Sequence, residues 1–132
     1  MPIYAKYITT PAKTQNEETI EIEGYALTNV SILFPPGCLG LVGVTVNYGI
    51  KQIAPFNEGE QLRGNGETIQ FGEFWILPEE RTKLTIVVNN EDDTYPHTIY
   101  VRLVVRKKEE LLYMQLTNAF IAALKAVFGF VG

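Results

Sequence analysis

The sequence predicts a mainly β protein: an antiparallel β-sandwich or jelly roll that ends in one C-terminal α-helix. Three observations lead to this prediction. Short segments that alternate apolar and polar residues recur as far as residue 106, and such alternation is typical of half-buried strands. Gly, Pro, Asn and Asp gather between these segments, as they do in turns. After residue 106 the apolar residues take up helical spacing instead.

The strands can be placed one after another along the chain. Residues 3–10 are rich in Tyr, Ile and Thr, and the polar residues 11–17 should end this first strand. Residues 19–23 alternate strictly, and we expect the strand to continue through a bulge at Gly24 to residue 27. The further expected strands are 30–34, 39–48, 50–53, 68–76, 83–89 and 98–106.

The alternation also predicts which side chains fill the core, because every second residue of a strand faces the same side. No helical period interrupts these segments, which argues against a parallel α/β sheet. The expected core residues are Ile20, Ile22, Val44, Val46, Ile69, Phe71, Leu84, Ile86, Val88, Ile99, Val101 and Leu103.

The C-terminal segment is the most informative part of the sequence. We divide the chain into a sandwich domain, residues 1–107, and an apolar helical tail, residues 108–132, with the helix itself expected over residues 111–132. Apolar side chains recur there at helical spacing and form an arc too wide for a surface helix. The residues expected to form an oligomer interface are Leu112, Leu116, Phe120, Leu124, Val127, Phe128 and Val131.

Three partners are open to such a helix: other copies of the chain, its own sandwich, or a membrane. The segment is long enough for a span, but Lys125 would lie within it at a high cost. Small residues would let helices approach closely. We therefore expect a homo-oligomer, with own-domain packing second and membrane contact third. The small residues are Ala119, Ala122, Ala123, Ala126 and Gly129.

Composition excludes some classes of function. The net charge of the 132 residues is -4, so the chain lacks the basic surface that nucleic-acid binding requires. The single cysteine, Cys38, cannot form an intrachain disulfide. The first residues, MPIYAK, lack the apolar core of a secretion signal. We therefore expect a cytoplasmic or virion location and no nucleic-acid partner.

Candidate catalytic and metal sites are incomplete. Residues 89–98 resemble the loop that presents the first copper-binding His of cupredoxins, but such a site also needs a Cys and a second His near the C-terminus. His97 is the single histidine, and Cys38 lies far upstream. The acidic run at residues 91–93 lacks the spacing of a calcium loop. Cys38 has no evident base beside it, so we expect no cofactor, no metal and no enzymatic activity.

Aromatic residues suggest an alternative function. Phe56, Phe71, Phe74 and Trp75 could form a platform on which a sugar ring stacks. Alternation places Phe74 and Ile76 on one face of their strand and Trp75 on the other. A carbohydrate- or ligand-binding sandwich is therefore the alternative to a structural protein.

Two stretches carry a resemblance to a group of proteins. They are FPPGC at residues 34–38 with GLVGV at 40–44, and NEDDTYPHT at residues 90–98. Together with the strands between them, they resemble small uncharacterised β-sandwich proteins of viruses and mobile elements of thermophilic microbes. The resemblance covers about residues 19–106 and consists of turn and strand residues. It implies a virion component, such as a capsid, decoration or spike protein, with other virion proteins among its partners.

Overall fold

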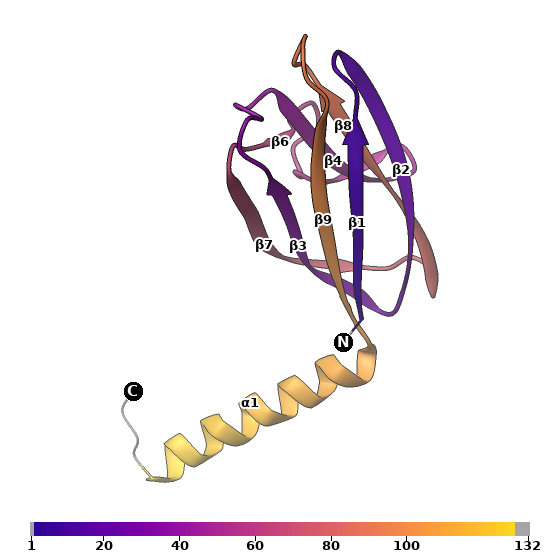
Figure 1. Ribbon diagram of the computed structural model, residues 1–132. Helices are drawn as coiled ribbons and strands as arrows, with labels where there is room; N and C mark the ends of the chain where they lie inside the picture. The colour runs from indigo at the N-terminus through magenta and orange to yellow at the C-terminus, as the bar shows by residue number, and fades with distance from the viewer. Residues whose placement is uncertain (1, 129–132) are drawn as a thin grey trace.

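A computed structural model describes residues 2–128 of the chain. Figure 1 shows two facing layers of strands and a helix that runs away from them. The first sheet has the order β1 (Ile3–Thr10), β9 (His97–Arg106), β3 (Ala26–Phe34) and β7 (Glu67–Ile76). The second has the order β2 (Thr14–Glu23), β8 (Arg81–Asn90), β4 (Val42–Tyr48) and β5 (Lys51–Ala54), and β6 (Leu62–Arg63) also pairs with β4. Neighbouring strands pair antiparallel, which confirms the predicted antiparallel β-sandwich.

The inner faces of the two sheets form the core. Strand alternation places one apolar set from each sheet in the space between them. Ten of the twelve predicted core residues are buried, and the other two, Ile69 and Phe71, are partly buried and pack against the core. Those two lie on β7, which is an edge strand with a neighbour on one side. The fully buried set also includes Leu27, Val30, Ile32, Phe34, Cys38, Val42 and Val105.

Gly24 is the point where the chain crosses from one sheet to the other. The sequence predicted a bulge in a continuous strand there, and that prediction is wrong: β2 belongs to the second sheet and β3 to the first. The φ angle of Gly24 is 149°, and a Cβ on this residue would lie 2.5 Å from Cγ1 of Val105. Only glycine fits such a close approach of the connection to β9.

Several strand boundaries also differ from the expected ones. The polar residues 14–17 were expected in a loop but belong to β2, where they pair with residues 87–90 of β8. A backbone ladder at a sheet edge tolerates polar side chains because these can face water. Strand β4 begins at Val42 rather than at residue 39, and the short β6 lies in an expected loop.

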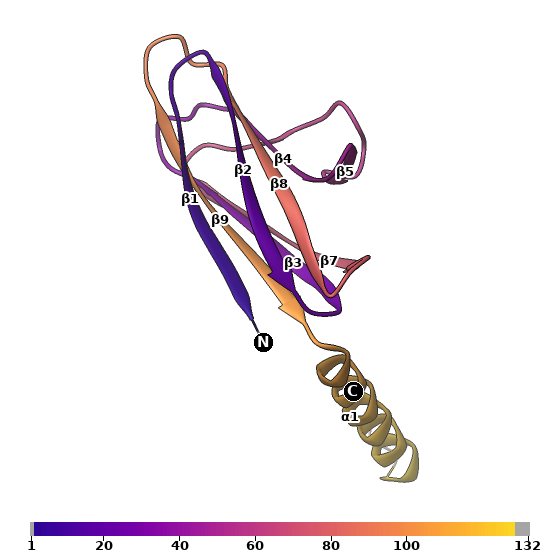
Figure 2. The same ribbon diagram turned by 90° about the vertical axis from the view of Figure 1, so that its right-hand side faces the viewer.

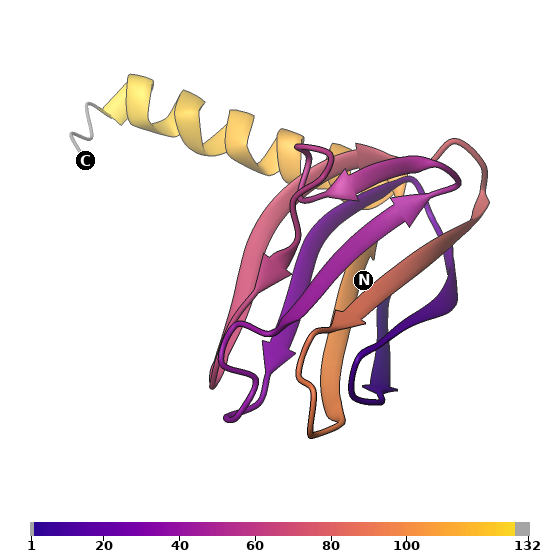
Figure 3. The same cartoon turned by 90° about the horizontal axis from the view of Figure 1, so that it is seen from above.

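Helix α1 (Lys108–Phe128) starts two residues after β9 ends. It begins three residues before the expected position, so that Glu109 and Glu110 lie in its first turn, where the helix dipole favours acidic side chains. Figures 1 and 2 show the helix leaving the end of the sandwich at which the chain begins. Seen from above, it extends past the β7 edge (Figure 3). Within residues 2–128, none of the helices has the length and apolar character needed to cross a membrane.

The core predicts a contrast between two neighbouring residues of β3. Phe34 is fully buried, whereas Leu33 is 39% exposed on the outer face of the first sheet. We expect Phe34→Ala to lower the free energy of unfolding by about 3–5 kcal/mol, because it leaves a cavity. Leu33→Ala should cost less than about 1 kcal/mol. Urea denaturation of both variants checks this, and equal losses would contradict the assigned faces of β3.

Candidate functional site

The exposed surface of helix α1 is the candidate functional site. Strand β9 ends at Arg106, and the helix is capped electrostatically by Glu109 and Glu110 at its start and by Lys125 in its last turn. Arg106 Nη1 lies 3.9 Å from Glu110 Oε2. The helix has 21 residues, which corresponds to a length of about 31 Å.

The side chains of this helix are exposed from Leu112 through Val127. Leu116 is 61% exposed, Phe120 65% and Val127 75%. Successive residues of a helix are rotated by about 100°, so residues spaced by four lie nearly in line along one face. We call the row formed by Leu112, Leu116, Phe120, Leu124 and Val127 the apolar stripe.

Beyond Leu112, which lines a groove beside the sandwich, the apolar stripe lies on the side of the helix away from that groove. An open groove of about 380 Å³ lies between the helix base and the first sheet, and Tyr25, Phe74, Leu111, Gln115 and Asn118 are among its lining residues. At about 100° per residue, Leu111, Gln115 and Asn118 lie on the side of the helix roughly opposite to the stripe. A partner can therefore approach the stripe from Leu116 onward on a side that does not face the groove.

The predicted interface residues can now be placed. Five of the seven form the apolar stripe on one exposed face. Phe128 is the last residue of α1, but its side chain is not among the described parts. Val131 lies outside the described residues. Own-domain packing, the second expectation, is limited to the base of the helix, where Leu111 and Leu112 line the groove beside the sandwich.

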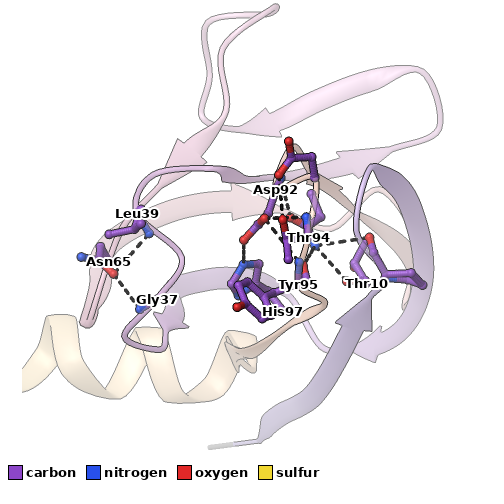
Figure 4. A network of polar contacts seen from close by, with 11 residues as sticks. Thr10, Gly37, Leu39, Asn65, Asp92, Thr94, Tyr95 and His97 are labelled. Carbon is purple, nitrogen blue, oxygen red and sulfur yellow. Dashed lines mark hydrogen bonds and ion pairs between the residues drawn. The ribbon is translucent and has the colours of Figure 1, made fainter.

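A polar network occupies the opposite end of the sandwich, where the chain folds around Asp92 (Figure 4). Asp92 Oδ1 accepts hydrogen bonds from the backbone N–H groups of Thr94 and Tyr95 at 2.9 and 3.3 Å. Asp92 Oδ2 lies 2.8 Å from Nε2 of His97. The bond to His97 is the largest of the effects that lower the pKa of Asp92 below 3.8, and the bonds from the backbone act in the same direction.

Asn90 connects this network to the neighbouring loop. Its Nδ2 donates to the carbonyl oxygens of Thr10, Pro11 and Tyr95 at 3.0 to 3.2 Å. Its Oδ1 accepts from the N–H of Asp92 at 3.0 Å. The network thus ties the β1–β2 connection to the β8–β9 connection, and each of these contacts is a structural one.

Cys38 lies in the core close to this network. Burial raises the pKa of its thiol, and the negative charge of Asp92 raises it further. Both effects favour the protonated thiol, whereas a nucleophilic cysteine needs a lowered pKa. A neighbouring turn is held by Asn65, whose Oδ1 accepts from the N–H groups of Gly37 and Leu39 at 3.0 and 3.2 Å (Figure 4). Among the described residues, no group of three or more His, Cys, Asp or Glu could hold a metal ion.

The four aromatic residues that the sequence suggested as a sugar-binding platform do not lie on one face of the protein. Trp75 and Phe71 pack against the core, whereas Phe74 and Phe56 are exposed. A different aromatic pair lies on the outer face of the first sheet, where Tyr7 of β1 stacks on Tyr100 of β9 with ring centroids 4.4 Å apart. The sequence reasoning missed this pair, because only the β1–β9 register places the two residues opposite each other.

Comparisons with known proteins show little similarity. No family model matches the sequence, and no curated protein matches it either. One solved structure with a similar chain is described as "Bacillus endospore appendages form a novel family of disulfide-linked pili". The two chains are 12% identical, the alignment covers 78% of this chain and 88% of that one, and the TM-score is 0.33. A match of this kind carries no argument about function.

The lowered pKa of Asp92 predicts a pH-dependent contribution to stability. A carboxyl group with a lowered folded-state pKa stabilises the fold above its unfolded pKa and loses that effect as the pH falls through the folded value. We therefore expect Asp92→Asn to be less stable than wild type at pH 7, with the difference shrinking below about pH 4. Asp93→Asn, in the same loop but exposed, is the control and should change little. Urea denaturation between pH 3 and 7 measures both, and a difference that stays constant with pH would contradict the assignment.

Proposed function

We propose that this protein is a non-catalytic structural component that assembles with other copies of itself through helix α1. The observation that carries the proposal is the apolar stripe, which lies on a helix that has left its own domain. As its setting we propose a virion, in which the protein would be a capsid, decoration or spike protein.

Physical chemistry supports a partner for this helix. An isolated helix is marginally stable in water, and most helices in proteins are stabilised by packing of an apolar face. Burying each large side chain of the stripe is worth about 1.5–3 kcal/mol. The sandwich offers no buried position for them, since strand side chains already fill its interior.

Other copies of the chain fit this surface better than a lipid bilayer. The side of the helix opposite the stripe holds Gln115, Asn118 and Lys125, and a protein partner would cover the stripe while these stay in water. Alanines between the large side chains allow a second helix to approach closely. The resemblance of residues 34–44 and 90–98 to sandwich proteins of viruses and mobile elements of thermophilic microbes supports the virion setting.

The alternative, a carbohydrate- or ligand-binding sandwich, has weaker support. Its proposed platform required Phe71 and Trp75 beside Phe74, and these side chains point to different faces of β7. The Tyr7–Tyr100 pair offers stacking rings, but neither ring lines the hollow of about 110 Å³ beside Arg102. Assembly through the helix therefore remains the function that the geometry supports best.

The stripe can be tested in the full-length protein. We expect the wild type to form a defined oligomer and the double variant Leu116→Gln with Phe120→Gln to dissociate at least about a hundredfold more readily, because two large apolar contacts are lost per subunit. Light scattering over a range of protein concentrations measures this. The matched control is Gln115→Ala with Asn118→Ala, on the opposite side of the helix, which should leave the association unchanged.

Two results would overturn the proposed function. The wild type could remain a monomer at every concentration, or both double variants could associate as tightly as the wild type does. Binding of wild-type monomers to neutral phospholipid vesicles would assign the stripe to a membrane surface instead.

A further inference from the structure

We propose that helix α1 pairs antiparallel with α1 of a second copy, with Leu116 of each helix facing Phe120 of the other. This inference rests on the proposed function, because it specifies how the apolar stripe is covered. It names the partner, the relative direction of the two helices and their register.

The spacing of side chains along the stripe defines a seam for one partner helix. Five residues follow one another at intervals of three, four, three and four positions: Tyr113, Leu116, Phe120, Ala123 and Val127. This is the spacing at which one helix packs along another with interlocking side chains. At about 100° per residue these five positions lie within a narrow arc, centred on the apolar stripe.

The sizes of the side chains decide the direction of pairing. In an antiparallel pair with Leu116 opposite Phe120, Tyr113 of one helix lies opposite Ala123 of the other. Each of these layers then combines a larger with a smaller side chain, and two facing helices pack best when large and small side chains alternate across the seam.

A parallel pair would place identical residues opposite each other. A layer of two Phe120 side chains would then be followed by a layer of two Ala123 side chains. A single distance between helix axes cannot suit both layers, since the first would be overpacked and the second would leave a void. The parallel arrangement is therefore disfavoured by packing alone.

The charges on the helix favour the same direction. Glu109, in the first turn, lies at the same angle around the helix as the centre of the stripe. In a parallel pair the two Glu109 carboxylates would face each other, and like charges at such positions repel. In an antiparallel pair of this register each Glu109 lies opposite Val127 of the partner, so the two carboxylates do not face each other, and the two helix dipoles oppose each other.

The placement of the sandwich leaves room for this pairing. The groove with Tyr25 and Phe74 includes Leu112 but none of the five seam residues from Tyr113 to Val127. Two helices joined along their stripes therefore hold their sandwiches on the outer sides of the pair, and the antiparallel order separates them toward opposite ends.

Cysteine cross-linking tests the register in the full-length chain. Cys38, the single native cysteine, is buried, so it should not interfere. We expect a mixture of the variants Leu116→Cys and Phe120→Cys to form mainly mixed disulfide dimers under mild oxidation, whereas each variant alone forms few. Strong disulfide formation by Leu116→Cys alone, in an otherwise intact oligomer, would overturn the antiparallel order.

A size exchange at one layer gives a second, independent test. Ala123→Phe should weaken the antiparallel pair by about tenfold, because the new ring meets Tyr113 of the partner. The exchange variant Tyr113→Ala with Ala123→Phe should restore association, since it reverses the layer. Ala122→Phe, which lies off the seam, is the control and should have little effect. In a parallel pair Ala123→Phe would fill a void and strengthen association, which is the opposite sign.

Failure of this inference differs from failure of the proposed function. If the wild-type protein is a monomer in light scattering, that result contradicts both the proposed function and the helix pairing. Suppose instead that the oligomer depends on the stripe, that Leu116→Cys alone forms disulfide dimers, and that Ala123→Phe strengthens association. These results would support the proposed function and contradict the antiparallel pairing.

Discussion

The packing of two antiparallel sheets against each other is the constraint on which the rest of this structure depends. Each strand contributes every second side chain to one shared interior, and those side chains fill it. A sandwich closed in this way has no inner position left for a further apolar element. Helix α1 carries large apolar side chains that have no place in this interior and that lie exposed outside the domain.

The two ends of the sandwich differ in structure. At one end, Asp92, Asn90 and His97 satisfy the polar groups of the connecting loops and bind the two sheets' turns together. At the other end, β9 passes almost directly into α1, so the helix is anchored to a central strand of the first sheet.

Much of this fold could be predicted from the sequence, for a physical reason. The alternation in segments such as residues 83–89 reports directly which side chains are buried, and Leu84, Ile86 and Val88 are fully buried. The sheet change at Gly24 could not be predicted, because strands on both sides of it alternate in the same way whichever sheet they join. The helical spacing predicted the stripe itself. It could not predict that the stripe is exposed, because a helix packed on its own domain would show the same spacing. The pairs Asp92–His97 and Tyr7–Tyr100 depend on loop geometry and strand register, which local patterns do not contain.

The central claim is that the sandwich is complete without the helix and that the helix serves assembly. The most direct measurement compares the full-length protein with a chain that ends after Lys107, using light scattering for mass and urea denaturation for stability. The account predicts that the shortened chain is a folded monomer with a cooperative unfolding transition, while the full-length chain is an oligomer. A shortened chain that is unfolded would contradict this prediction. So would a shortened chain that forms an oligomer with the same number of subunits as the full-length protein.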